Sequence, residues 1–451
     1  MALFNKSSKA SGSRNRERPD TTQLDEYPPN EMTVRYTLDE HRDQLLGMVQ
    51  PLAPFGMSLI DAWEHTLCED IKSYTDMPPV AVAEIDGYAV RASDAMTTDM
   101  GYAPALLLRD APHKVVASQA DESMEPVSFI AKGEAVLVRA GEQLPENADT
   151  VLASWQAAVS DSGSHITAVA RVNPGDWVRP PQAEAATGQL LMSAGTLLDD
   201  RCSALLAAAG FDRIMVRPRT RVALVQVQDQ SNDANLSSGR ANDVGLSLIS
   251  GACRADGATI WRTQIDLTDP DEGRERISDE LIRADMVLTI GGLTEDYADP
   301  RLVSILTELG DVRVVDVALR PGQKQGFGLI GDDNLPLVML PGDPTAALVA
   351  YHAFARPVMR RLMGVEPYAH EPILCFAEHD FDAEVGVTQL VPCRLRQQGN
   401  RYLASEIISR NHSWLTTLAA ANGFVTIPPT RPRVFAGEAM GCWLLGDGPV
   451  A

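Results

Sequence analysis

The spacing of apolar residues changes several times along the chain, and each change marks an expected segment. Residues 1–34 are polar and contain no apolar run that would suit a secretory signal, so we expect a disordered tail. Helical spacing begins in TLDEHRDQLLGMVQPL, residues 37–52, where Thr37 and Glu40 form the pattern of a capping box. The same spacing predicts a second helix over residues 57–71.

Short apolar runs separated by Gly, Pro and Asp come next, and they predict strands. These runs are ALLLRD, HKVVAS, AVLVRAG, TVLASW and SHITAVARV. We expect a β-rich insertion domain over residues 103–171. It interrupts a discontinuous N-terminal helical and linker domain made of residues 35–102 and 172–216, which includes a predicted helix in LLDDRCSALLAAAGF.

Strand patterns then alternate with helix patterns, which is typical of a parallel sheet covered on both faces. The strands are VALVQV, ATIWRTQI, MVLTIGG, VRVVDVAL and PLVML, and the helices are SLISGACRADG, DEGRERISDELIRAD, RLVSILTELG and AALVAYHAFARPVMRRLM. They predict a central three-layer α/β domain over residues 217–366. Short strand patterns in residues 367–451 predict a C-terminal β domain, so the expected fold class is α/β plus β, in several domains.

Composition narrows the classes of function. The chain has 451 residues, 39 Lys and Arg against 61 Asp and Glu, and a formal net charge of −22 at pH 7. This balance argues against nonspecific binding to nucleic acid or to an anionic membrane surface, because both need a basic face. No run approaches the roughly 18 apolar residues that insertion across a membrane needs. The six cysteines lack metal-ligand spacing, so we expect a cytoplasmic protein with reduced thiols.

Loops that follow the predicted parallel strands are the first places to look for a ligand site. The Gly pair 291–292 follows one strand, and the residues 341–343 follow another. Paired glycines let backbone N–H groups approach a ligand, and a helix N-terminus favours an anion. The LPGDP run fits equally well a tight turn in which Asp343 caps a helix and Pro344 opens it.

Six segments resemble, in order, the landmarks of one protein family. They are AEIDGYAVRASD (83–94), AVLVRAGEQLPENADTVL (135–152), the Gly pair at 291, LRPGQKQGFG (319–328), LPGDPTAALV (340–349) and LAAANGFVTIP (418–428). Together they resemble the molybdopterin molybdenumtransferases, the MoeA family, which includes the E domain of gephyrin. The resemblance covers residues 35–451.

This resemblance implies a homodimer of elongated, multidomain subunits, in which a small domain of the second subunit completes each site. The family reaction inserts molybdate into adenylylated molybdopterin with Mg²⁺ and releases AMP. By resemblance, the catalytic positions are Asp86, Asp229 and Asp243, and the last two are also the expected Mg²⁺ ligands. The expected cofactor-binding positions, for molybdopterin and molybdate, are Gly291, Gly292, Thr294, Arg320, Pro341, Gly342 and Asp343.

The sequence departs from the family pattern at the expected site. The RxxGED segment reads RPPQAE at 179–184, and the STGDEL loop reads QVQDQS at 226–231, which retains only its Asp. The downstream Asp-Thr-Asn is reduced to DVG at 243–245, and the Ser-Val-Gly-Asp after the Gly pair reads LTED at 293–296. In the KPGKP cation pair the first Lys is Arg and the second is Gln323, while LPGNP has become LPGDP.

Charges at the matched positions oppose an anionic substrate. The carboxylates are Asp86, Glu184, Asp229, Asp243, Glu295, Asp296 and Asp343, and the cations are Arg179, Arg320 and Lys324. Asp343 would place a carboxylate at the helix N-terminus where an anionic ligand should bind. A bound Mg²⁺ would offset part of this repulsion. Turn residues of the frame, such as Gly87 and Gly322, are retained, which suggests a former enzyme with another use.

These observations favour a repurposed dimeric scaffold similar to gephyrin, without a cofactor. By analogy with gephyrin, it would bind the cytoplasmic segment of a membrane receptor and connect it to the tubulin-like division protein FtsZ. That receptor would recruit it to the membrane or the division site. The alternative is an active molybdenumtransferase that uses Mg²⁺, molybdopterin and molybdate. A third alternative, an unrelated enzyme on the same frame, has no catalytic motif to support it.

Overall fold

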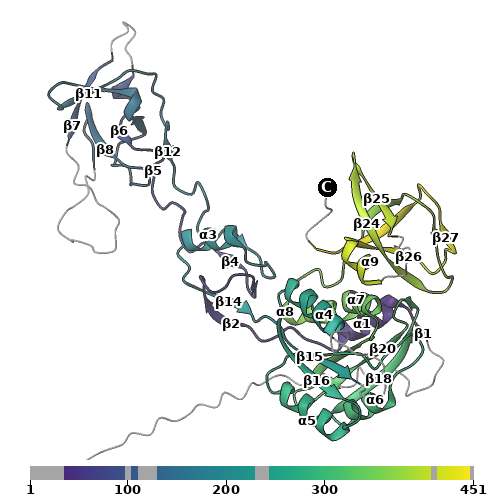
Figure 1. Cartoon of the computed structure of the whole chain (residues 1–451). Coiled ribbons are helices and arrows are strands. Elements are labelled where there is room, and N and C mark those ends of the chain that lie inside the picture. Colours follow the sequence, from purple (N-terminus) through teal and green to yellow (C-terminus); the bar gives the residue numbers. More distant parts are fainter. Residues whose placement is uncertain (1–34, 97–102, 110–128, 229–242, 408–413, 447–451) are drawn as a thin grey trace, which may run out of the picture. The chain divides into compact units, whose positions relative to one another are not determined.

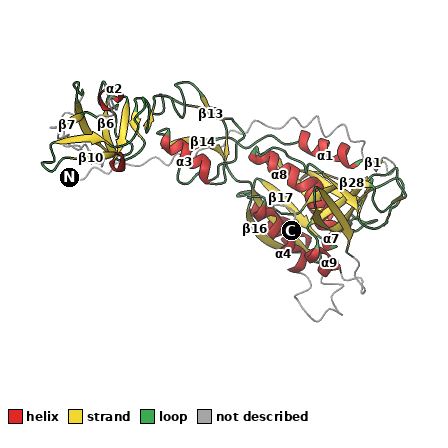
Figure 2. Cartoon of the chain, turned by 90° about the horizontal axis from the view of Figure 1, so that it is seen from above, coloured by secondary structure: helices red, strands yellow, loops and turns green. Residues whose placement is uncertain are grey.

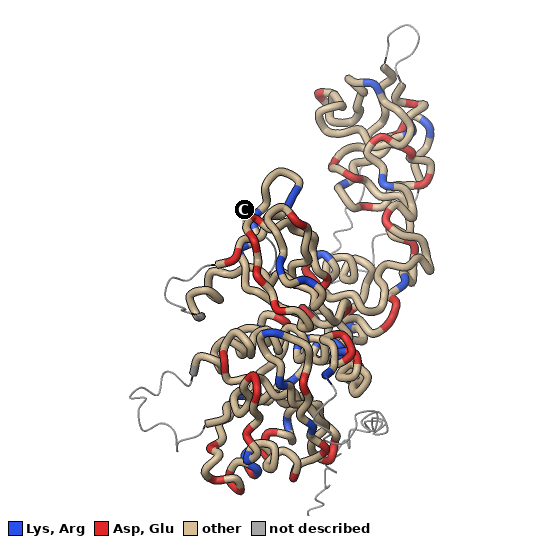
Figure 3. The backbone as a smooth tube through the Cα atoms, turned by 90° about the vertical axis from the view of Figure 1, so that its right-hand side faces the viewer, with Lys and Arg blue, Asp and Glu red and all other residues tan. Residues whose placement is uncertain are grey.

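The computed structural model describes residues 35–96, 103–109, 129–228, 243–407 and 414–446. The chain divides into two compact units, each described by itself (Figure 1). The larger unit comprises Met1–Cys68, Gly195–Asp199 and Ile214–Ala451, and the smaller unit comprises Glu69–Ala194 and Asp200–Arg213. Acidic residues are spread over the described parts of both units (Figure 3).

The larger unit contains a seven-stranded sheet in the order β1-β18-β20-β21-β17-β15-β16. Its strands are β1 (Arg35–Tyr36), β15 (Arg221–Gln228), β16 (Thr259–Asp266), β17 (Met286–Ile290), β18 (Gly310–Val317), β20 (Lys324–Ile330) and β21 (Leu335–Leu340). Strands β16, β15, β17 and β21 are parallel, as predicted. Strand β20 is antiparallel to both of its neighbours, so the sheet is mixed, and the expectation of a parallel sheet holds only for the other part of it. Part of the LRPGQKQGFG motif forms this unforeseen strand.

Helices cover both faces of this sheet, which confirms the three-layer α/β arrangement (Figure 1), and Figure 2 looks down on one of the two helical layers. On one face lie α1 (Leu38–Gly47), α4 (Asp243–Ala255), α7 (Pro344–Ala350), the π-helix η4 (Tyr351–Ala355) and α8 (Arg356–Met363). The other face is covered by α5 (Pro270–Leu281) and α6 (Pro300–Thr307). Successive residues of β15 alternate between the two hydrophobic clusters, with Val222 and Leu224 in one and Ala223 and Val225 in the other, as the period of a strand requires.

The two helices predicted before residue 72 have different outcomes. Helix α1 is confirmed with its capping box, in which Glu40 N–H donates to Thr37 Oγ1 over 3.2 Å and Thr37 N–H donates to Glu40 Oε2 over 2.9 Å. The helix predicted over 57–71 was wrong. That segment holds turns and the strands β2 (Phe55–Ser58), β3 (Thr66–Leu67) and β4 (Ile71–Lys72).

Pairing with distant strands explains this correction. Strands β2 and β3 flank β14 (Arg213–Arg217), and β4 pairs with β13 (Leu190–Met192). Ile60 and Trp63 would belong to the apolar face of a helix, but they are 89% and 46% exposed. Non-local strand pairing therefore outweighs the local helical spacing.

The smaller unit is built around a six-stranded sheet in the order β10-β11-β7-β8-β6-β9. Its strands are β6 (Gly87–Val90), β7 (Ala105–Arg109), β8 (Glu134–Val138), β9 (Thr150–Ala153), β10 (Ala157–Val159) and β11 (His165–Ala168). The unit also contains β5 (Val82–Ala83), β12 (Val178–Arg179), α2 (Ala92–Ala95), η2 (Ser154–Gln156) and α3 (Asp200–Ala208). Strand β6 lies before residue 103, where the insertion was expected to begin. The run HKVVAS lies outside the described residues.

The predicted C-terminal β domain is present as a sheet in the order β19-β24-β25-β22-β28-β26. Its strands are β19 (Leu319–Arg320), β22 (Ile373–Ala377), β24 (Thr388–Gln398), β25 (Arg401–Glu406), β26 (Gly423–Ile427) and β28 (Ala439–Leu444), beside β23 (Phe381–Asp382), β27 (Arg433–Val434) and α9 (Trp414–Ala420). Because β26 also pairs with β24, the sheet closes into a barrel. Cys375, Cys393 and Cys442 are buried in its core.

Candidate functional site

Two loops at the carboxyl ends of neighbouring parallel strands lie side by side, as the sequence predicts. Gly291 N–H, after β17, donates to Leu340 O over 3.1 Å, and Gly342 N–H, after β21, donates to Leu293 O over 3.1 Å. A Cβ atom at Gly342 would lie 3.6 Å from the Cα of Gly291. The structure therefore brings together four of the predicted positions, namely Gly291, Gly292, Pro341 and Gly342.

Packing accounts for part of the glycine requirement in these loops. Gly291 and Gly292 have φ values of 98° and 75°, in the region that favours glycine. A Cβ at Gly292 would lie 2.4 Å from Cδ2 of Leu302, in α6. Retention of this Gly pair is thus explained by the fold, and it does not by itself indicate a bound ligand.

Asp343 caps helix α7 with its own side chain. Its carboxylate accepts a hydrogen bond from Ala346 N–H over 2.9 Å, and Pro344 stands at the first helical position. The interpretation of LPGDP as a capped tight turn is confirmed. An anion approaching the first turn of α7 would meet this carboxylate, because the cap places a negative charge at the helix end that otherwise favours anions.

A second carboxylate occupies an anion cradle beside the Gly pair. Glu295 accepts hydrogen bonds from Gly322 N–H over 2.6 Å, from Gln323 N–H over 3.0 Å and from Arg320 Nη1 over 2.8 Å. Two backbone N–H groups and a guanidinium that donate to the same carboxylate form a typical binding site for an anion. Here the chain fills that site itself, with side chains of Glu295 and Arg320 that are both about one-third exposed.

The remaining predicted cations are also held by carboxylates of the chain. Lys324 Nζ lies 2.7 Å from Asp316 Oδ1. Arg179 Nη1, in the smaller unit, lies 3.8 Å from Glu184 Oε1. Arg320 has a second carboxylate, that of Glu384, at 3.6 Å. Every cation counted in the sequence as a substrate clamp is therefore in an ion pair within the chain.

Thr294 and Gln323, which lie in two different loops, both contact other groups of the chain. Thr294 donates from N–H to Tyr297 O over 2.8 Å, and its hydroxyl lies 3.5 Å from the same oxygen. Gln323, which stands where the family has a Lys, accepts a hydrogen bond from Arg35 Nη2 over 3.0 Å. Both residues therefore make contacts within the chain.

The described part of the structure does not test the arrangement of the three predicted catalytic aspartates. Asp86 is exposed in the smaller unit, where its Oδ1 accepts a hydrogen bond from Ala140 N–H over 2.9 Å. Asp229 and the side chain of Asp243 lie outside the described residues. Among the described residues, no group of three or more His, Cys, Asp or Glu side chains is arranged to hold a metal. The predicted Mg²⁺ site stays a prediction.

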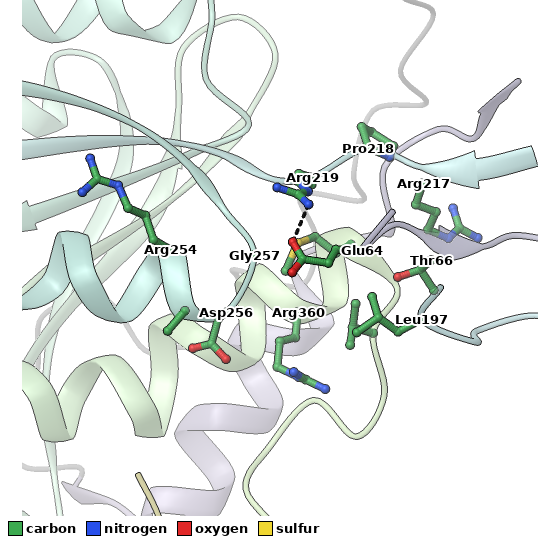
Figure 4. A pocket seen from close by; sticks show the side chains of 13 residues that line it. Glu64, Thr66, Leu197, Arg217, Pro218, Arg219, Arg254, Asp256, Gly257 and Arg360 are labelled. Atoms are coloured by element: carbon green, nitrogen blue, oxygen red, sulfur yellow. Dashed lines mark hydrogen bonds and ion pairs between the residues drawn. The ribbon is translucent and has the colours of Figure 1, made fainter. Parts of the chain in front are cut away.

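The larger unit contains a pocket of about 160 Å³ that the sequence did not predict (Figure 4). Its lining includes Arg217, Arg219, Arg254 and Arg360, with Glu64 and Asp256 as carboxylates. The only sequence signal was the RPRTR run at 217–221, which the apolar pattern assigns to a strand. Figure 4 shows the side chains of Arg217, Arg254 and Arg360 pointing in different directions, so they do not converge on one ligand.

Partners within the chain explain the directions of Arg217 and Arg360. Arg219 Nη2 pairs with Glu64 Oε2 over 2.6 Å. Arg217 Nη1 donates to Leu52 O over 2.7 Å, and Arg360 Nε donates to Pro367 O over 2.9 Å. Burial lowers the pKa of the Arg360 guanidinium, and the like charge of Arg356 lowers it further. At this pocket Arg219 is therefore in an ion pair, whereas Arg217 and Arg360 donate to backbone carbonyl oxygens.

Sequence and fold are both similar to those of known proteins. Models of the MoeA N-terminal region (domain I and II), a probable molybdopterin binding domain and the MoeA C-terminal region (domain IV) match residues 36–210, 229–361 and 377–445. Molybdopterin molybdenumtransferase 1 of Mycobacterium tuberculosis is 29% identical over 418 residues, which are 89% of this chain and 97% of that protein. Molybdopterin molybdenumtransferase of Bacillus subtilis is 25% identical over 380 residues, 82% and 85% of the two chains.

Two structures of the molybdopterin biosynthesis MoeA protein from Pyrococcus horikoshii have the same fold. Their TM-scores are 0.70 and 0.69, with 24% and 18% identity, and each match covers 91% of this chain. Fold and loops thus define a multidomain protein with a central domain of the molybdopterin-binding type. The chain belongs to the MoeA family of molybdenum cofactor biosynthesis.

Proposed function

We propose that this MoeA-family chain works as a dimeric protein scaffold and does not insert molybdenum. The observation that carries the proposal is the carboxylate of Glu295 in the cradle formed by Arg320, Gly322 and Gln323. Molybdate and adenylylated molybdopterin are anions, so they would have to displace this carboxylate or bind beside it. Either course is opposed by like-charge repulsion in a partly desolvated loop.

The cap of α7 adds to this obstacle. Asp343 already accepts the Ala346 N–H group at the helix start, so the helix end offers an anion one donor fewer and one repelling charge more. Electrostatic stabilisation usually supplies most of the rate enhancement in such chemistry, and loss of one donor typically costs about a hundredfold to a thousandfold in rate. In both loops a carboxylate of the chain occupies donors that an anionic substrate would need. This supports a loss of molybdenum insertion activity.

The scaffold part of the proposal rests on analogy with gephyrin. A dimer presents each surface twice, which raises the apparent affinity for multivalent partners. In the form that we propose, a cytoplasmic homodimer binds the cytoplasmic segment of a membrane receptor and the tubulin-like division protein FtsZ, and the receptor recruits it to the membrane or division site. Within the described residues, no helix combines the length and apolar character that crossing a membrane requires.

An active molybdenumtransferase is the second candidate, and the similarity to proteins with that name favours it. The relative from Mycobacterium tuberculosis matches over 97% of its own length. In the present chain, the loops with Gly291 and Gly342 lie side by side at the strand ends. In this case Mg²⁺, molybdopterin and molybdate would be required. Arg320 would then have to exchange Glu295 for the substrate, and Asp229 and Asp243 would be the metal ligands.

AMP release separates the two candidates. Purified full-length chain is mixed with adenylylated molybdopterin, Mg²⁺ and molybdate, and molybdate-dependent AMP is measured beside the Mycobacterium tuberculosis molybdopterin molybdenumtransferase 1. We expect release at least about a hundredfold slower than that of the relative. A rate comparable with the relative would refute the scaffold-only function.

Direct binding tests the other half of the proposal. The full-length chain is titrated with purified FtsZ, first in solution and then with receptor segments displayed on a bead, so that bridging between the two can be measured. Binding of both partners at once is expected. If FtsZ does not bind at the concentrations found in a dividing cell, the partner named here is wrong.

A further inference from the structure

The pocket of Figure 4, which we call the arginine pocket, lies away from the strand-end loops. Its residues Arg219 and Gly257 come just before β15 and β16, so they stand at the amino ends of these parallel strands. The loops with Gly291 and Gly342 follow the carboxyl ends of β17 and β21, which run parallel to β15. A strand of eight residues such as β15 spans about 23 Å, so the two regions lie at opposite ends of the sheet. The arginine pocket is therefore separate from the site that the family resemblance implies.

Three of the four arginines that line the arginine pocket have no carboxylate partner among the described residues. They are Arg217, Arg254 and Arg360. Arg217 and Arg360 donate to the backbone carbonyl oxygens named above, and because a guanidinium has five N–H donors, each of them keeps donors for a ligand. Arg254 is exposed in the last turn of α4 and makes no hydrogen bond or ion pair within the described part of the chain.

The two carboxylates of the lining are already engaged. Glu64 pairs with Arg219 over 2.6 Å. Asp256 also attracts the Arg360 guanidinium, but it is held by a hydrogen bond from Arg356 Nε over 2.8 Å. The arginine pocket thus keeps an excess of positive charge in a chain whose formal net charge is −22, and this excess favours an acidic ligand.

The size and the lining of the pocket favour one side chain of a longer segment over a compact anion. Its volume of about 160 Å³ is below the roughly 300–1,000 Å³ that is typical of small-molecule sites. Figure 4 shows the three arginines without a carboxylate partner pointing in different directions, so no single anionic group could contact all of them. Part of the lining is apolar, namely Leu197, Pro218, Met363 and Val365. Leu197 is 48% exposed, so this part of the lining is open to a partner.

We propose that the arginine pocket binds an acidic peptide segment of a partner protein, with one apolar side chain in the pocket and flanking Asp or Glu side chains on Arg217, Arg254 and Arg360. Separate carboxylates along an extended segment can reach guanidinium groups that point in different directions, and they form charge-assisted hydrogen bonds with them. A basic segment would be repelled. This proposal deepens the scaffold function and rests on it, because it gives the scaffold a docking surface and states the chemistry of its partner.

The test uses the full-length chain and a short synthetic peptide in which Asp-Gly repeats flank one Leu on both sides. A second peptide, with Asn in place of every Asp, is the neutral probe. Binding is measured by calorimetry at physiological ionic strength. We expect the Asp peptide to bind at least about tenfold more tightly than the Asn peptide, because several exposed ion pairs form at once. Failure of the Asp peptide to bind, or equal affinity for the two peptides, would overturn the proposal.

Arg254→Gln tests the arginine that has no partner within the chain. It should weaken binding of the Asp peptide by about threefold, the size of one exposed ion pair, whereas Arg254→Lys keeps the charge and should keep most of the affinity. Arg262→Gln is the matched control, because Arg262 is also exposed, on β16, and lies outside the pocket. Equal effects of the two Gln variants would assign binding to the overall charge of the chain and contradict the proposal.

Leu197→Ser tests the apolar part of the lining. Loss of this half-exposed side chain should weaken binding of the Asp peptide by about fivefold, with little change in the unfolding temperature. A purely structural Arg254, which favours the negative end of α4, would give a lower unfolding temperature and an unchanged affinity in Arg254→Gln. That result, with full affinity in Leu197→Ser, would refute the proposal. So would conversion of a dimer to a monomer by Leu197→Ser, which would make the pocket a subunit contact.

Failure here and failure of the scaffold function give different signals. If the Arg254 and Leu197 variants bind the Asp peptide as the parent does, while AMP release stays negligible, the scaffold proposal survives with another docking surface. Rapid AMP release would instead refute the scaffold proposal and leave the peptide data standing.

Discussion

The strand-end loops and the arginine pocket of the larger unit differ in the groups that their hydrogen-bond donors contact. In the loops, N–H groups and cations that could hold an anion are occupied by Glu295 and Asp343. In the pocket, Arg217 and Arg360 are balanced by backbone carbonyl oxygens, which carry no full charge. The net charge of −22 describes the whole chain and does not describe each site on it. What a loop can bind depends on which of its donors are already used.

The largest expected effect comes from Asp256, on the wall of the arginine pocket. Its carboxylate accepts from Tyr351 Oη over 2.8 Å and from Arg356 Nε over 2.8 Å, and the Asp256 and Arg356 side chains are 13% and 14% exposed. Asp256→Ala would leave a buried guanidinium unpaired, so we expect the free energy of unfolding to fall by about 3–5 kcal/mol. Urea unfolding measures it.

Glu64→Ala is the matched control for that variant. It removes a carboxylate from the same pocket, but Glu64 is half exposed and pairs with the partly exposed Arg219. Surface pairs contribute about 0–1 kcal/mol, so the loss should stay below that of Asp256→Ala. Equal losses of unfolding free energy in the two variants would show that burial of the Asp256–Arg356 pair does not increase its contribution to stability.

Acid should weaken the region next to the pocket. Nδ1 of His352 lies 2.9 Å from Nε2 of His370, and burial, with the nearby charge of Arg356, lowers the pKa of each ring to about 3. The unfolded chain binds these protons below about pH 6.5, whereas the folded chain does not bind them until about pH 3, so stability is lost as pH falls through that window. Between pH 7 and 5 each ring should account for about 2 kcal/mol.

A double variant isolates the contribution of this pair. His352→Gln together with His370→Gln removes both titrating rings, so the fall in unfolding free energy between pH 7 and 5 should be smaller than in the parent chain. His41, which lies against Phe327 and Phe354 and whose pKa burial also lowers to about 3, continues to titrate in both proteins. If the double variant loses as much stability as the parent over this interval, the pair is not responsible.

Emptying the cradle should change binding more than stability. Glu295→Ala frees Arg320 and the N–H groups of Gly322 and Gln323, and molybdate affinity should rise by about tenfold, or about 1.4 kcal/mol. Equilibrium dialysis with inorganic molybdate measures the change. Glu384→Ala is the control, since it removes a more distant carboxylate of the same Arg320. An unchanged affinity would mean that the filled cradle is not what excludes the anion.

Local patterns predicted much of the fold and part of the candidate site. The capping box of α1 and the helix start at Asp343 depend on neighbours in the chain, so the sequence shows them. The strands that replace the helix over 57–71 depend on distant partners that no local spacing shows. Strand β20 instead pairs with its sequence neighbours β18 and β21, and the LRPGQKQGFG motif gave no strand pattern there. Glu295 was counted as a negative charge, but its place in the cradle depends on a loop 25 or more residues away.

The contact between two exposed tryptophans illustrates the same limit in the smaller unit. Trp155 and Trp177 are far apart in sequence and meet only because η2 and the start of β12 are adjacent in the fold. A pattern search finds two isolated aromatic residues there, and nothing in the sequence marks the positive φ of Trp177. Such a contact becomes visible only when the backbone is known.

The smallest expected effect concerns the cap of α7. Asn caps a helix about as well as Asp, so Asp343→Asn should change the unfolding free energy by less than about 0.5 kcal/mol, whereas Asp343→Ala should cost about 1 kcal/mol. Combined with Gln323→Lys, the Asn variant exchanges a repelling charge for an attracting one and should raise the affinity for molybdate or AMP. If the combined variant still binds neither anion while Glu295→Ala does, the cradle alone sets the difference between the loops and the arginine pocket, and the cap only ends a helix.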